Sequence, residues 1–167
     1  MKILLISLTS LCLTGACALH AQTPAPASAS AATNLDFGDF KSSTLTGKAW
    51  KALDEKDYAS AVGYTQKCID MFKDQAVTQQ KGLTAAPDTS DKGKVFANWA
   101  LNDVGTSYYI QGKAKEGLND TKGAIAAYQF LTDNLSYARC WDTKGWFWGP
   151  AGAAKERLGA LQFDSIK

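Results

Sequence analysis

The sequence predicts an all-α domain, built from two antiparallel helix hairpins and a C-terminal helix that caps them. Three observations carry this prediction. Apolar residues recur at steps of three and four along four segments between residues 45 and 135. A polar turn joins the members of each pair, and it carries an aspartate able to cap the next helix, Asp57 and then Asp120. Small residues stand where paired helices would cross, which allows close approach.

The first hairpin covers residues 42 to 81. Its first helix is expected to begin at Ser42 or Ser43, because serine side chains cap helix N-termini well. Its second helix is expected to follow Asp57 and to end before Gly82, since glycine often follows a helix C-terminus. The residues predicted to face the core are Leu45, Ala49, Ala52 and Leu53, then Tyr58, Ala61, Val62, Thr65, Cys68, Ile69, Phe72 and Ala76.

The second hairpin follows a loop and begins at Ser90 or Asp91. Gly105 and Gly112 lie about two helical turns apart and therefore share one face. Because glycine costs roughly 1 kcal/mol in a helix interior, the pair indicates close approach of a neighbouring helix. The alternative is that Gly112 ends the helix. The predicted inner faces are Phe96, Trp99, Ala100, Val104, Ser107, Tyr108, Gln111 and Ala114, then Ala124, Ile125, Tyr128, Leu131 and Leu135.

Residues 136–149 follow no simple period and contain three tryptophans. We expect this segment to fold back over the free end of the second hairpin. Pro150 then opens a last helix, because proline suits the first helical position. A terminal helix with one apolar face usually covers the open end of a repeat stack.

The N-terminus predicts export. Residues 1–21 have the pattern of a signal peptide, with Lys2 before a short apolar core and a small residue, Ala21, at the expected cleavage position. The alternative is a lipoprotein modified at Cys17. Residues 22–34 read as an Ala/Pro/Ser-rich linker, which leaves 35–167 as the folded domain. We expect a periplasmic or secreted protein with no transmembrane span after cleavage.

Composition excludes several chemistries. The net charge is +2 and no basic run occurs, so nucleic acid is not an expected partner. The single histidine, His20, lies in the predicted signal peptide, so we expect no metal site and no cofactor in the mature chain. Two cysteines remain after export, Cys68 and Cys140. They are either a disulfide, worth roughly 4 kcal/mol for such a long loop, or two separate buried thiols.

Laid over each other, the two hairpins resemble the tetratricopeptide repeat (TPR). The first has Ala49 in its first helix, Asp57-Tyr58 at the turn and Ala61 at the crossing, and the second has Ala124 at the crossing. The family's repeat is about 34 residues, whereas these crossing alanines lie 63 positions apart (124 − 61). The second and third helices are therefore expected to exceed the family's length. The Cys-Trp-Asp…Gly-Trp-Phe-Trp-Gly-Pro-Ala ending is similar to that of small exported bacterial TPR-like proteins, mostly uncharacterised and some carrying a glucanase label.

The resemblance implies a concave face, lined by the first helices of successive repeats, that binds an extended peptide or a partner helix. The function expected from it is an exported protein–protein interaction or scaffold module. The alternative for each aromatic on this face is a place in the core under the cap. Mapped by position, the candidate partner-binding residues are Trp50, Leu53, Trp99, Asn102, Thr106 and Tyr109.

A second hypothesis is a carbohydrate-binding or glucanase-associated protein. Sugar rings stack on exposed indoles, and the candidates are Trp141, Trp146 and Trp148. Hydrolysis would require two carboxylates about 5–10 Å apart, one of them with a raised pKa. The acidic residues of this chain fall in turns or on polar helix faces, with no strand motif to align them. We therefore expect no catalytic residues and no enzyme activity.

Overall fold

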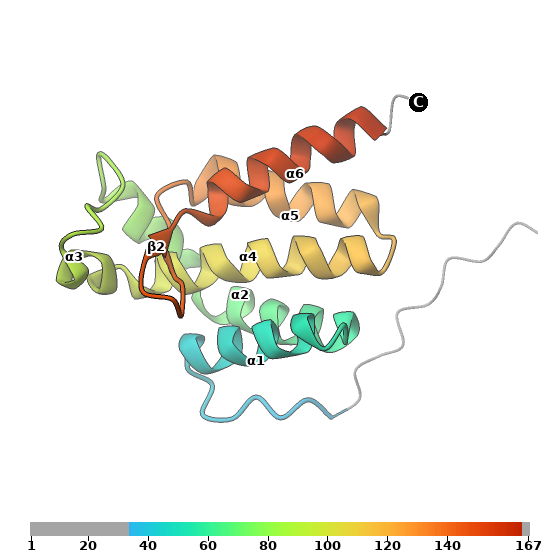
Figure 1. The fold of residues 1–167 in the computed structure, drawn as a ribbon. Coiled ribbons are helices and arrows are strands. Elements are labelled where there is room, and N and C mark those ends of the chain that lie inside the picture. The colour runs from blue at the N-terminus through green and yellow to red at the C-terminus, as the bar shows by residue number, and fades with distance from the viewer. Residues whose placement is uncertain (1–33, 165–167) are drawn as a thin grey trace, which may run out of the picture.

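The computed structural model describes residues 34–164, and it confirms the predicted all-α class. This part of the chain forms six helices and one short hairpin of strands (Figure 1). The predicted signal peptide, the candidate lipidation site Cys17 and all of the predicted linker except Asn34 lie outside the described residues. The elements are α1 (Ser42–Asp54), α2 (Tyr58–Lys81), α3 (Lys92–Ala97), α4 (Trp99–Gly117), α5 (Thr121–Asn134), β1 (Cys140–Trp141), β2 (Phe147–Trp148) and α6 (Pro150–Asp164).

The long helices form two antiparallel pairs, α1 with α2 and α4 with α5. Helix α4 lies at the centre, where it contacts α1, α2, α5 and α6. Helix α6 packs on α5 and α4 at one end of the stack, while α1 lies at the other (Figure 1). The central place of α4 explains why its sequence shows no single apolar stripe, because it is covered on several sides.

The predicted aspartate caps are confirmed. The side chain of Asp57 accepts from the backbone N–H of Ser60 at 3.1 Å, and Asp120 accepts from Gly123 N–H at 2.9 Å. The prediction that Ser42 or Ser43 caps α1 is wrong, because Lys41 occupies that position and makes no side-chain cap bond. Ser42 is the first residue of the helix instead, and its hydroxyl donates to the Asp103 carboxylate of α4.

The predicted third helix is interrupted, and it forms α3 and α4 on either side of Asn98. The carbonyl of Val95 accepts from Asn98 N–H at 3.1 Å and from the side-chain amide of Asn102 at 2.8 Å. At the new N-terminus, Leu101 N–H donates to the Gln79 side chain of α2 at 2.8 Å. Side chains thus satisfy backbone groups that a continuous helix would pair internally, which makes the break stable.

At the two glycines of α4, neighbouring segments approach the helix backbone closely, as predicted. A Cβ built on Gly105 would lie 2.5 Å from the Ala138 Cβ, and one on Gly112 would lie 2.3 Å from the Tyr128 ring. The alternative that Gly112 ends the helix is wrong, because α4 continues to Gly117. Glycine at these positions lets Tyr128 of α5 and the segment before β1 contact the α4 backbone.

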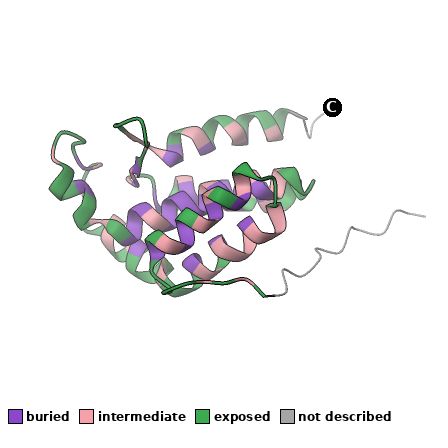
Figure 2. Ribbon diagram, turned by 60° about the horizontal axis from the view of Figure 1, so that its bottom comes forward, coloured by how far each residue is buried: buried purple, intermediate pink, exposed green. Residues whose placement is uncertain are grey.

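The buried residues gather in the middle of the stack (Figure 2). The predicted core stripe of α2 is confirmed at Thr65, Cys68, Ile69 and Ala76, which are all buried. Two residues predicted on the inner face of the third helix are not in the core. Phe96 is 56% exposed and Trp99 is 40% exposed.

The segment after α5 forms a hairpin that the sequence did not predict. Trp141 pairs with Phe147, and Cys140 pairs with Trp148. In the turn, the Asp142 side chain accepts from Lys144 N–H at 2.8 Å, and Gly145 adopts φ 108°, a region that disfavours other residues. The hairpin contacts α4 through β1. Among the helices of residues 34–164, none combines the length and apolar character that a bilayer crossing requires.

Candidate binding groove along helices α1 and α4

One face of α1 and one face of α4 line a groove that the β1–β2 hairpin borders. The groove consists of three adjoining clefts, which we number first, second and third, of about 420, 400 and 700 Å³. All three share Trp50. The α1 residues that line it recur at helical spacing from its first turn to its last: Ser43, Thr46, Gly47, Trp50, Leu53 and Asp54.

The first cleft has mainly aromatic walls. Its aromatic residues come from α1, α3, α4 and both strands of the hairpin, so they meet only in the folded protein: Trp50, Phe96, Trp99, Trp141 and Phe147. The Phe147 ring contacts Trp141 and Phe96 edge-on, with centroids 4.8 and 5.6 Å apart. Trp99 packs edge-on against Phe72 of α2 at 5.5 Å. These contacts hold the rings in place while Trp99 and Trp141 stay about two-fifths exposed, at 40% and 41%.

Trp148 lines the second and third clefts. Its ring contacts Tyr109 edge-on at 5.3 Å and Trp50 at 6.5 Å. Trp50 and Tyr109 also contact each other, with centroids 6.2 Å apart. The hairpin therefore covers part of the face that α1 and α4 would otherwise present to solvent.

Asn102 holds the first cleft together. Its side-chain amide donates to Val95 O at the end of α3, and its oxygen accepts from Arg139 N–H at 2.8 Å. Both polar ends of this buried side chain are thus engaged by the protein. Thr106 is buried as well, next to the Cys140 thiol. These two predicted site residues shape the cleft and offer little surface to a ligand.

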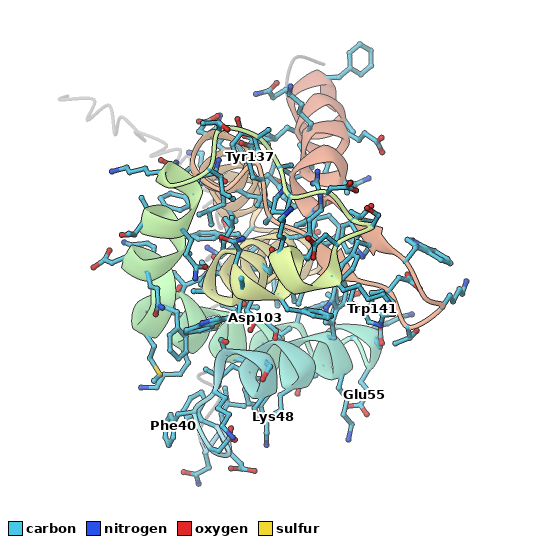
Figure 3. The ribbon with its side chains drawn as sticks, turned by 90° about the vertical axis from the view of Figure 1, so that its left-hand side faces the viewer. Phe40, Lys48, Glu55, Asp103, Tyr137 and Trp141 are labelled. Atoms are coloured by element: carbon cyan, nitrogen blue, oxygen red, sulfur yellow. The ribbon has the colours of Figure 1, made fainter. Side chains whose placement is uncertain are left out.

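Asp103 is the acidic residue of the first cleft. Figure 3 shows it between α4 and α1, and it accepts a hydrogen bond of 2.5 Å from the Ser42 hydroxyl. Burial raises the pKa of its carboxyl above the usual value, and the bond from Ser42 opposes that only in part. None of the ion pairs found in residues 34–164 includes Asp103.

The other two clefts differ in charge. Asp54 and Asp142 line the second cleft, and none of the described residues that line it is basic, although Asp54 also borders the third cleft. The third cleft is balanced, since it contains Asp54 and Glu116 together with Lys56 and Lys113. Burial raises the pKa of Glu116, but the ion pair with Arg157 of α6 and the hydrogen bond from the Tyr128 hydroxyl outweigh it and hold the pKa below its ordinary value.

The structure brings the six candidate partner-binding residues to one groove. Trp50 lines all three clefts, Leu53 and Tyr109 the third, and Trp99, Asn102 and Thr106 the first. The candidate sugar-stacking residues do not all line the groove. Trp141 and Trp148 border the groove, whereas Trp146 lies outside the three clefts at the hairpin turn, 50% exposed and beneath the Lys144 ammonium.

Sequence reasoning missed Asp103, Arg139 and Phe147. Asp103 follows Trp99 by four positions and precedes Thr106 by three, so helical spacing alone could have indicated that it shares their face. Arg139 and Phe147 belong to the segment without a period, and no local signal connects them to α1 or α4.

The structure decides between the two arrangements that the sequence left open for the cysteines. Cys68 and Cys140 are separate, buried free thiols rather than a disulfide. Burial raises the pKa of Cys68 to about 12 and also raises that of Cys140. Within residues 34–164, no group of three His, Cys, Asp or Glu side chains is arranged to hold a metal ion. No family model, curated protein or solved structure matches this chain.

Proposed function

We propose that this chain is an exported, non-catalytic, TPR-like interaction module that binds an extended peptide or helix of a partner protein in the groove along α1 and α4. The observation that carries the proposal is the convergence of aromatic side chains from α1, α3, α4 and the hairpin on a cleft that stays open to solvent. Export rests on the sequence pattern of residues 1–21.

The helix order supports a TPR-like arrangement. The α1/α2 and α4/α5 pairs stand as two repeats, with α2 and α1 both in contact with α4. Helix α6 contacts α5 and α4, as the first helix of a third repeat would. The 24-residue α2 and the inserted α3 account for the long spacing between the crossing alanines.

The dimensions and rigidity of the groove support binding. The three clefts lie within the range of roughly 300–1,000 Å³ that is typical of ligand sites. Trp50, Trp99 and Trp141 each have two side-chain torsions, and neighbouring rings already restrain them. Ordering such side chains on binding costs little entropy, which is why tryptophan and tyrosine serve as interface anchors.

A carbohydrate ligand is the second candidate. It is favoured by the exposed indoles of Trp99 and Trp141, which border one cleft with the hydrogen-bonding groups of Asp103 and Arg139. The peptide proposal has the stronger support, because Trp146 lies outside the clefts that Trp141 and Trp148 line, and the clefts follow α1 from Ser43 to Asp54.

The test is selection of displayed random 12-residue peptides on the immobilised full-length protein, with a glycan array in parallel. Trp99→Ala removes an exposed wall of the first cleft. Trp146→Ala is the matched control, because it removes an indole that is somewhat more exposed and lies outside the clefts. Circular dichroism melts establish that both variants fold.

We expect the selection to yield binding peptides. Trp99→Ala should weaken their binding by roughly 10-fold or more, the loss typical of an interface anchor. Trp146→Ala should leave their binding unchanged. Saccharide binding that depends on Trp141 would favour the second candidate. If no peptide is enriched, or if enriched peptides bind the Trp99→Ala protein equally well, the groove is not the binding site.

A further inference from the structure

Taken together, the first and second clefts are lined by more acidic than basic side chains. Asp103 lies in the first, and Asp54 and Asp142 lie in the second. Among residues 34–164, Arg139 is the one basic side chain that lines either cleft, and the Lys92 ammonium lies over the outer wall formed by Trp141. The whole chain has a net charge of +2, so the acidic character is local to this part of the groove. Local charge of one sign attracts a ligand of the opposite sign.

Arg139 does not neutralise Asp103. Its guanidinium donates to the carbonyl of Ala138 at 3.3 Å and approaches Gly149 at the base of the hairpin. Within the described part of the chain, the hydrogen bond to the Asp103 carboxylate comes from the neutral hydroxyl of Ser42. A partly buried carboxylate without a cationic partner is less favourable than a solvated one, and a ligand cation would reduce that cost.

Aromatic rings beside Asp103 add to the attraction for a cation. Trp99 and Trp50 line the same cleft, and an ammonium or guanidinium group binds favourably over an indole face. The protein already uses one wall of the cleft in this way, because the Lys92 ammonium lies 4.8 Å from the centre of the Trp141 ring. The combination of a carboxylate and aromatic walls fits the side chain of lysine or arginine.

The two acidic positions are separated by the length of α1. Asp103 contacts Ser42 at the start of the helix, and Asp54 is its last residue. Twelve residues at about 1.5 Å each give roughly 18 Å between them. An extended peptide advances about 3.3 Å per residue, so about five residues span that distance.

We propose that the groove selects an extended peptide segment with two basic side chains about five residues apart, one held by Asp103 between Trp50 and Trp99 and the other by Asp54 and Asp142. This inference rests on the proposed function and names the partner's chemistry. The basic residue at Asp103 is the more specific contact, because that carboxylate is less exposed to competing water and salt.

The test uses fluorescein-labelled 12-residue peptides and the full-length protein in anisotropy titrations at low and high salt. One peptide carries two lysines five residues apart in a Gly/Ser/Leu background. The second has both lysines acetylated, and the third has them adjacent. The protein variants are Asp103→Asn, Asp54→Asn and, as a control with the same loss of charge, Asp74→Asn on the exposed surface of α2.

The inference expects the spaced lysine peptide to bind most tightly and to weaken with added salt. Asp103→Asn should weaken binding roughly 10-fold, as expected for a charge pair that is partly shielded from water. Asp54→Asn should weaken it about 2- to 5-fold, as for an exposed pair, and Asp74→Asn should leave it unchanged. Equal binding of the lysine and acetyl-lysine peptides would overturn the inference and leave the proposed function standing. Equal binding of the spaced and adjacent peptides would overturn the two-site arrangement. If display selection yields no binding peptide either, the proposed function fails as well.

Discussion

Replacement of Gly112 by alanine tests how closely α4 and α5 approach. In an ordinary helix this change is favourable by roughly 1 kcal/mol, because glycine is the poorer helix former. Here the new Cβ would lie 2.3, 2.5 and 2.7 Å from three atoms of the Tyr128 ring, where 3.4–4 Å is ordinary contact. The ring must therefore shift by about 1 Å to restore a normal contact.

Tyr128 has little room to shift. Its side chain is fully buried, and its hydroxyl donates to Glu116 at 2.6 Å. Overpacking of a tight core costs roughly 1–3 kcal/mol, and displacement of the ring would also weaken a hydrogen bond to a charged group, worth about 1.5–3 kcal/mol. After the gain in helix propensity, we expect Gly112→Ala to lose roughly 1–3 kcal/mol of unfolding free energy.

The measurement is urea denaturation followed by circular dichroism. Gly159→Ala is the matched control, since it lies in α6 with no atom within 4 Å of the added Cβ, and it should gain about 0.4–1 kcal/mol. In the Tyr128→Ala background the cost of Gly112→Ala should largely disappear, as a double-mutant cycle would show. A Gly112→Ala protein as stable as the parent would refute the close crossing.

Three further predictions follow from the titratable groups. Because burial raises the pKa of Asp103, the folded protein binds its proton more tightly than the unfolded chain does, so this carboxylate destabilises the fold as pH rises. Asp103→Asn should therefore gain roughly 0.5–2 kcal/mol at neutral pH, and thermal melts should show that gain vanish below about pH 3.9, the ordinary value for aspartate. The pKa of Cys68 is raised to about 12 and both thiols are buried, so a thiol reagent at mildly alkaline pH should modify neither cysteine until the protein unfolds, as mass spectrometry would detect; rapid native labelling would contradict this. Bonds from Arg157 and Tyr128 hold the pKa of Glu116 low, so Glu116→Gln should lose roughly 1–2 kcal/mol after allowance for solvent screening. That loss should shrink as pH falls below about 4.5, because protonation removes the same interaction from the parent protein; a loss that persists in acid would contradict this reasoning.

Features that depend on neighbouring residues were predictable from the sequence. Asp57, Asp91 and Asp120 each bond to a backbone N–H three residues ahead, so their role needs no knowledge of the fold. The prediction that Ser42 caps α1 was wrong because its hydrogen-bond partner is distant in the sequence. Its hydroxyl is engaged by Asp103, which lies 61 positions away and becomes its neighbour only when α1 meets α4.

The break at Asn98 could not be predicted from local sequence either, because it too depends on contacts between helices. Helical spacing continues across it, but Gln79 of α2 satisfies the N-terminus of α4 and Asn102 satisfies the carbonyl of Val95. The candidate groove residues on α1 and α4 were predictable because periodicity and the repeat pattern assign helix faces. Arg139 and Phe147 were not, since tertiary contacts of an aperiodic segment decide where they lie.

The hairpin also limits what the groove can bind. In a longer repeat array the groove would continue onto the first helix of the next repeat. Here Trp148 packs on Trp50 and Tyr109, so the open face of the groove extends little beyond α1, about 18 Å for its 13 residues. A ligand of five or six extended residues buries too little surface for area alone to give tight binding, so affinity must come from a few strong anchors. The half-exposed indoles and the unpaired Asp103 are the groups able to supply them. For that reason, substitution of Trp99 or Asp103 should weaken ligand binding through lost contacts. Asn102 and Thr106 are buried, so their substitution should remove few contacts with a ligand.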